Sequence, residues 1–126
     1  MVPIDQISGS EETGMVGEPT HFELGVGDAK RAKDFYTRLF GWQFHQMGTG
    51  AEGWVETGAA RGGLHENDPN PGMVVYFSVH DIESALKTVK QLGGEPGPAS
   101  PEEPGFGRFA ECRDDQGTRF GLHQPN

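Results

Sequence analysis

The sequence predicts an α+β fold in which one strand–helix–strands unit occurs twice along the chain. Apolar residues alternate in two segments, and each segment is followed by an aspartate and a helical stripe of apolar residues. The two halves also form an internal repeat, because residues of similar chemistry recur 53 positions apart. The matched pairs are Phe22/Val75, Leu24/Phe77, Val26/Val79, Asp28/Asp81, Ala32/Ala85, Leu39/Leu92 and Gly41/Gly94. We therefore expect each half to be one supersecondary unit whose apolar face needs a partner to cover it.

The first half is predicted to open with a strand from Thr20. Phe22, Leu24 and Val26 show the period of two that is typical of a half-buried strand. Asp28 can cap a helix that ends near residue 41. The apolar stripe of this helix comprises Ala29, Ala32, Phe35, Tyr36, Leu39 and Phe40. Three short strands follow, predicted at 42–47, 53–57 and 60–65.

The second half repeats this order after the turn-rich loop 67–72. Val75, Phe77 and Val79 alternate, and Asp81 precedes the next helix. The stripe of that helix comprises Ile82, Ala85, Leu86, Val89 and Leu92. The prolines in 95–103 restrict this segment to an edge strand or an irregular rim. Two last strands are predicted at 107–112 and 119–123, joined by a turn at 114–117.

Length and composition exclude several classes of protein. The 126 residues suit one domain, and residues 1–19 have the composition of a flexible tail. No stretch is apolar enough to cross a bilayer, and the first residues do not resemble a secretory signal, so a cytoplasmic protein is expected. Cys112 is the single cysteine and is expected to be an inert, packed thiol. The net charge of −9 argues against nucleic acid or a membrane as a partner.

Three segments carry a resemblance to a known family. HFELGVGDAKRAKDFYTRLFGW (21–42), YFSVHDIESAL (76–86) and GRFAECRDDQGTRFGLHQ (107–124) resemble the paired βαβββ modules of the glyoxalase/bleomycin resistance/extradiol dioxygenase (vicinal oxygen chelate) superfamily. They are most similar to its single-domain bacterial glyoxalase-like members. The resemblance covers residues 20–124, with one module at about 20–66 and the other at about 73–124. It implies a mixed sheet curled around a cavity, a homodimer and a small-molecule ligand.

The same resemblance implies a divalent metal, which superfamily enzymes usually hold with His and Glu side chains from the first and last strands of each module. Only His21 matches such a ligand position; the others fall on Val74, Gly121 and either Gly62 or Gly63. A lone imidazole offers too few donors for a catalytic metal. We therefore expect the usual metal cofactor to be absent, with His21 a weak metal candidate. A site completed by Glu56, His65 or His123 stays open as an alternative.

The predicted ligand pocket consists of the side chains that point away from the helices. Its residues are His21, Glu23, Trp54, Glu56, Tyr76, Ser78, Arg119 and His123. Aromatic rings combined with acid, base and hydroxyl groups are typical of a small-molecule site. The catalytic candidates are His21, Glu23 and Glu56, because a paired Glu23 and His21 can transfer a proton. The same pair can equally be a static hydrogen bond.

Three functions follow from these observations and remain open. The first is metal-independent binding of a small organic molecule, as in bleomycin-resistance proteins. The second is a lyase or isomerase that acts on a small carbonyl compound. The third is a regulatory or structural partner domain whose cavity is vestigial.

Overall fold

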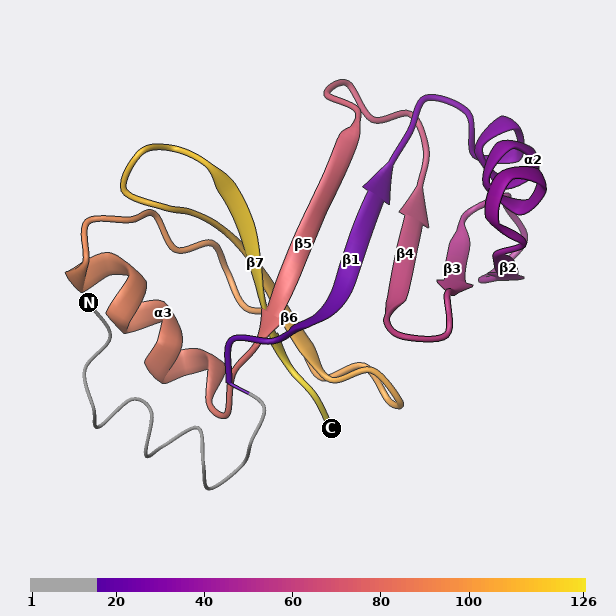
Figure 1. Ribbon diagram of the computed structural model, residues 1–126. Helices are drawn as coiled ribbons and strands as arrows, with labels where there is room; N and C mark the ends of the chain where they lie inside the picture. Colours follow the sequence, from indigo (N-terminus) through magenta and orange to yellow (C-terminus); the bar gives the residue numbers. More distant parts are fainter. Residues whose placement is uncertain (1–15) are drawn as a thin grey trace. The chain divides into compact units, whose positions relative to one another are not determined.

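The computed structural model describes residues 16–126, which contain two helices and seven strands (Figure 1). In chain order they are β1 (Pro19–Gly25), α2 (Ala29–Phe40), β2 (Gln43–Gln46), β3 (Gly53–Glu56), β4 (Arg61–His65), β5 (Gly72–Ser78), α3 (Ile82–Gln91), β6 (Arg108–Arg113) and β7 (Arg119–Gln124). The chain divides into two compact units. The first unit is Thr20–Val75, and the second is Tyr76–Asn126 together with the described residues before Thr20. No helix among the described residues is long and apolar enough to span a membrane.

The first unit contains strands in the order β2-β3-β4-β1. β1 runs parallel to β4, whereas β4 and β3, and β3 and β2, are antiparallel. Phe22, Leu24 and Val26 face helix α2, as their alternation predicts. The buried centre of this core comprises Leu24, Ala29, Ala32 and Leu64. The helix therefore covers one face of the sheet and leaves the other face to polar residues.

Helix α2 begins and ends where the sequence predicts. The side chain of Asp28 accepts a hydrogen bond from the Arg31 amide, and Gly41 ends the helix with a positive φ of 76°. The predicted apolar stripe is only partly buried, however, because Phe35, Leu39 and Phe40 are each 58% exposed. The helix meets the sheet through the two small residues of its first half, Ala29 and Ala32. In the second half the aromatic rings pack on one another: Tyr36 and Phe40 contact Trp42, with ring centroids 5.2 and 5.0 Å apart.

The second unit repeats this arrangement and confirms the internal repeat. β5 runs parallel to β7, and β7 is antiparallel to β6, just as β1, β4 and β3 are related in the first unit. A single bridge between Glu95 and Arg113 stands where β2 would be, since the proline-rich 95–103 segment forms isolated bridges and no named strand. Asp81 caps α3 by accepting from the Glu83 and Ser84 amides.

The core of the second unit comprises Ile82, Ala110, Cys112 and Leu122. Burial raises the pKa of the Cys112 thiol, which agrees with the inert role predicted for it. Val79 packs against this core as predicted, but Val75 is 41% exposed. Leu92, predicted to belong to the α3 stripe, lies beyond the end of the helix and is 71% exposed.

In strand β5 the most buried side chains are not those of the predicted alternating set, Val75 and Phe77. They are the side chains between them, Val74, Tyr76 and Ser78. Tyr76 is buried partly because it pairs with Gly121 on β7. Gly121 has no side chain, and the tyrosine ring occupies the space that a side chain there would fill. The predicted flexible tail at 1–19 lies outside the described residues up to position 15. Beyond that point, the Gly17 amide donates to the Ser78 carbonyl at 2.7 Å and the Ser78 amide donates to the Glu18 carbonyl at 2.8 Å.

Candidate functional site

The face of the first unit's sheet opposite α2, which we call the polar face, carries the sequence-predicted residues of this unit. Strand register places His21, Arg61 and Glu56 in one row, and Glu23, Gly63 and Trp54 in the next. The structure thus brings His21, Glu23, Trp54 and Glu56 onto one face. It adds His45, Arg61 and His65, which occupy alternate positions on β2 and β4.

A chain of hydrogen-bonding groups runs across this face with Glu23 at its centre. His65 Nδ1 lies 3.2 Å from Glu23 Oε1, and His65 Nε2 lies 2.9 Å from Asp68 Oδ2. His21 Nε2 lies 3.5 Å from Glu23 Oε2, at the limit of a hydrogen bond. The closer partner of Glu23 is therefore His65 rather than His21, the partner considered from the sequence.

Two glycines leave space for these side chains. An added Cβ at Gly63 would collide with the Glu23 carboxylate, so the carboxyl group occupies the volume that a side chain on β4 would fill. A Cβ at Gly25 would collide with Asp68 Oδ2 and would lie 2.8 Å from His65 Nε2. The glycines of β1 and β4 thus allow the carboxylates to lie close against the sheet.

The loop after β4 holds Asp68 in place. Its backbone is fastened to the β1–α2 connection, since the Asn67 amide donates to the Gly27 carbonyl at 3.2 Å and the Asp68 amide donates to the Val26 carbonyl at 3.0 Å. Asn67 has a positive φ of 58°, which asparagine tolerates better than most residues. The Glu66 carboxylate accepts from the Ala29 amide at 3.1 Å, at the start of α2. Asp68 is therefore positioned by the backbone hydrogen bonds of Asn67 and of Asp68 itself.

The electrostatics of His65 follow from this setting. Burial lowers the pKa of His65, but hydrogen bonds and charges of Asp68 and Glu23 outweigh that effect and raise the pKa above its ordinary value. The side chain of Asp68 is 13% exposed and that of Glu23 is 31% exposed. A partly buried imidazole between two carboxylates can hold a proton or pass one on.

Trp54 lies on β3 beside these hydrogen-bonded groups, where it pairs with Gly63 of β4. Its ring stacks on His45 with centroids 4.2 Å apart, and the Arg61 guanidinium lies 5.4 Å from its centroid. Glu56 is exposed. The polar face thus combines an aromatic ring, a guanidinium and a carboxylate–imidazole–carboxylate chain.

The remaining predicted pocket residues lie in the second unit. Tyr76 makes an edge contact with Phe109 at 5.8 Å, and Phe109 stacks on His123 at 4.6 Å. His123 Nε2 lies 2.6 Å from the Phe106 carbonyl oxygen, so this nitrogen carries the proton and donates. The buried Ser78 hydroxyl has no hydrogen-bond partner in the described part of the chain. Arg119 donates from Nε to Glu111 Oε2 at 2.9 Å.

The family's usual metal positions can now be assigned. The register pairs Glu23 with Gly63 as it pairs Tyr76 with Gly121, so Gly63 and not Gly62 is the last-strand position of the first module. The spaces at these two glycines are filled by the Glu23 carboxylate and the Tyr76 ring, and Val74 offers no donor atom. Within residues 16–126 no three His, Cys, Asp or Glu side chains are arranged to hold a metal. The donor set does not fit the usual metal centre.

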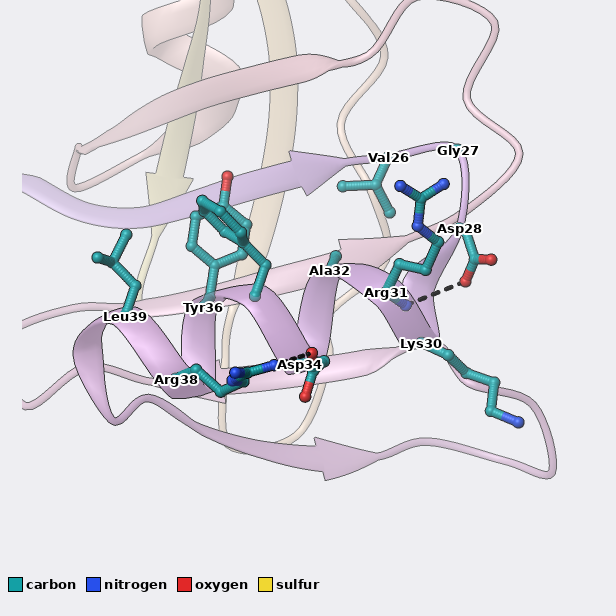
Figure 2. Close-up of a pocket in the computed structure, with 11 residues that line it drawn as sticks. Val26, Gly27, Asp28, Lys30, Arg31, Ala32, Asp34, Tyr36, Arg38 and Leu39 are labelled. Carbon is teal, nitrogen blue, oxygen red and sulfur yellow. Dashed lines mark hydrogen bonds and ion pairs between the residues drawn. The ribbon is translucent and has the colours of Figure 1, made fainter.

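A hollow of about 1160 Å³ lies along α2 and shares no residue with the predicted pocket (Figure 2). Phe35 and Leu39 line it together with charged side chains that include Arg31 and Arg38. Arg38 makes an exposed ion pair with Asp34 at 3.4 Å. Such exposed pairs contribute little energy. We place the candidate site on the polar face, where partly buried acid and base groups contact one another.

Comparison with known proteins gives the class to which the fold belongs. The chain belongs to the Glyoxalase/Bleomycin resistance protein/Dioxygenase superfamily, whose family model matches residues 19–122. Anthracycline biosynthesis protein DnrV of Streptomyces peucetius is 30% identical over 84% of this chain, and DauV of Streptomyces sp. (strain C5) is 29% identical over the same share. The chain spans 46% of the length of each of these relatives.

Solved structures show the same fold. Methylmalonyl-CoA epimerase from Mycobacterium tuberculosis superimposes with a TM-score of 0.67 and 16% identity, over 89% of this chain and 90% of that chain. Homoprotocatechuate 2,3-dioxygenase from Arthrobacter globiformis superimposes with a TM-score of 0.70 and 15% identity, over 89% of this chain and 37% of that chain. These structures confirm the α+β fold with βαβββ modules, and at this identity they carry no statement about activity.

Proposed function

We propose that the chain binds a small organic molecule at the polar face without the usual catalytic metal. The observation that carries this proposal is the Glu23–His65–Asp68 chain, which lies over Gly63 and Gly25 beside Trp54. A carboxylate held in place next to an aromatic ring can orient a ligand that has an apolar ring and a hydrogen-bond donor. The names of the relatives suggest where to look, since two are anthracycline biosynthesis proteins and one structural neighbour was solved with methylmalonyl-CoA.

A thermal-shift screen tests this proposal after metal analysis of the purified chain. The panel contains anthracyclines, CoA thioesters, and zinc, nickel, manganese and iron ions. A ligand that binds the folded chain raises the melting temperature by mass action. We expect a shift with an organic compound and none with a metal alone. Stoichiometric bound metal or a shift specific to one metal would contradict the metal-free part of the proposal.

A second candidate function, a lyase or isomerase acting on a small carbonyl compound, is favoured by the same carboxylate and imidazole groups. Glu23 would accept a proton from the carbon next to the carbonyl, and His21 and His65 are the imidazoles close to it. This function would be favoured over binding alone if the unchanged chain turns over a bound compound and if His21→Ala or Glu23→Gln abolishes that turnover. If the chain shows neither ligand binding nor turnover, the third class, a regulatory or structural partner, is favoured. The homodimer and the cytoplasmic location stay predictions from the sequence.

A further inference from the structure

We propose that His65 is a positioning residue: at neutral pH it is a doubly protonated imidazolium that bridges Asp68 and Glu23, and it thereby fixes the Glu23 carboxylate over Gly63. The bridge itself is a property of the ligand-free chain. Its effect on ligand binding rests on the function proposed above, in which Glu23 is the group that receives the ligand.

The protonation state follows from the partners of the ring. Both nitrogens of His65 lie within hydrogen-bonding distance of carboxylate oxygens, at 3.2 Å for Glu23 and 2.9 Å for Asp68. An ionised carboxylate only accepts hydrogen bonds, and a neutral imidazole has only one N–H to donate. Two simultaneous hydrogen bonds to two ionised carboxylates therefore require both nitrogens to carry a proton. The alternative is a protonated carboxyl group beside a neutral imidazole, which is disfavoured because a carboxylic acid is ordinarily a stronger acid than an imidazolium.

The surroundings are built for this bridge. Gly25 leaves the space in which His65 and Asp68 meet, and Gly63 leaves the space for the Glu23 carboxylate. The Asp68 amide donates to the Val26 carbonyl, and the Asn70 amide donates to Asp68 Oδ1 at 2.8 Å, so both the backbone and the carboxylate of Asp68 are held beside the ring. These separate features therefore favour one geometry, which a chance surface contact would not require.

The charged groups around the ring agree with the assignment. Glu23 and, through it, His21 face His65 from β1, and Asp68 faces it from the following loop. Arg61 lies farther along β4 and contacts Trp54. The carboxylates raise the pKa of His65 in spite of its partial burial. Since the folded-state pKa is raised, the bridge persists to a higher pH than that at which an ordinary histidine loses its second proton, and it is lost as the pH rises through the raised value.

The consequence for the site is a change in the freedom of Glu23. With the bridge complete, Oε1 is occupied by His65 and the carboxylate has one orientation. When His65 loses its second proton, only one carboxylate can keep its hydrogen bond. The contact with Asp68, at 2.9 Å, is shorter than the contact with Glu23, at 3.2 Å, so Glu23 is the carboxylate expected to lose its bond to the ring. Glu23 is then expected to change from a fixed acceptor to a mobile one within a narrow range of pH.

Nuclear magnetic resonance of the ligand-free 126-residue chain tests the proposal. Long-range ¹H–¹⁵N spectra report which ring nitrogens of His65 carry a proton, and His65→Gln assigns the signals. We expect both nitrogens to be protonated at pH 7. We expect the midpoint of the titration to move to lower pH in Asp68→Asn and in Glu23→Gln, and to be unchanged in the matched control Asp115→Asn, which removes the same charge from the 114–117 turn of the second unit.

A neutral His65 ring at pH 7, or a midpoint that Asp68→Asn and Glu23→Gln leave where it is, would overturn the proposal. Retained backbone amide spectra show that the variants still fold, so a lost bridge can be told from a lost structure. No ligand is used in these measurements. A screen without a hit would therefore contradict the proposed function and leave the bridge intact, while an unbridged His65 would remove the positioning role even if a ligand binds.

Discussion

At the scale of single residues, the polar face depends on two glycines as much as on its charged side chains. Gly25 and Gly63 have no side chain, and the volume of each is taken by a carboxylate. This arrangement puts the acid and base groups against the sheet, where solvent screens them less than on an open surface. The positions of the Glu23 and Asp68 carboxylates thus depend on the space left by Gly63 and Gly25.

Gly25→Ala tests this support. The new methyl group would collide with Asp68 Oδ2 and crowd His65 Nε2, so the pair must separate. We expect the free energy of unfolding, measured with urea, to fall by about 1–3 kcal/mol, the usual cost of an overpacked site. Gly27→Ala is the matched control, because nothing lies within 4 Å of a Cβ at that position. An equal loss in both variants would show that the cost comes from the backbone and not from the carboxylate.

The pH dependence of stability gives a second prediction at this scale. The raised pKa of His65 means that its ion pairs stabilise the folded chain below the ordinary histidine pKa, and that this contribution disappears as the pH rises through the raised value. Asp68→Asn should therefore destabilise the chain more at pH 6 than at pH 9. Because the His65 side chain is 42% exposed, we expect less than about 1 kcal/mol. A loss that is larger at pH 9 would contradict the assigned sign.

At the scale of secondary-structure elements, Asp28 and Asp81 cap the two helices at their first residues. The connection before Asp28 also holds the loop that carries Asp68. Asp28 accepts from the Arg31 amide, and the connection just before it receives the amides of Asn67 and Asp68. Asp28→Ala should lower the free energy of unfolding by about 1 kcal/mol, the usual cost of a lost N-cap. Asp28→Asn keeps a capping oxygen and should leave stability nearly unchanged. Equal losses in the two variants would rule out the capping role.

The elements also show which features a sequence can predict. The alternation of Phe22, Leu24 and Val26 fixes a strand and its buried face, because the side-chain period of a strand is two. The exposure of Phe35 and Leu39 was not predictable from spacing, since it depends on how closely the alanines let α2 approach the sheet. Helical spacing shows which residues share a face, but not how much of that face is covered.

The site was predictable to a similar extent. The strand period puts His21 and Glu23 on one face and Trp54 and Glu56 on one face, and the register lays both pairs on the polar face. His65 was harder to place, because the paired glycines before it leave the register of β4 ambiguous in the sequence. Asp68 was missed, since it joins the site through the path of a loop and follows no period. The alternation of positions 61, 63 and 65 was the one signal that could have found His65.

At the scale of the whole molecule, the fold belongs to a superfamily that hosts several kinds of chemistry, so the function must be argued from the site. The two units repeat one topology, yet their sheets carry different groups opposite the helices. The first unit has the acid–imidazole chain. The second has the aromatic contacts of Tyr76, Phe109 and His123 and the buried Ser78 hydroxyl. This difference is our reason for placing ligand recognition on the first unit.

We expect Glu23 on the polar face to receive a small organic ligand. Titration calorimetry with the compound that gives the largest shift in the thermal screen measures the contribution of this carboxylate to binding. We expect Glu23→Gln to weaken binding by about tenfold or more, because a hydrogen bond to a charged group contributes about 1.5–3 kcal/mol. The matched control Glu103→Gln, an exposed residue of the second unit, should bind as the unchanged chain does. Equal affinity in all three proteins would contradict the account and place recognition elsewhere on the molecule.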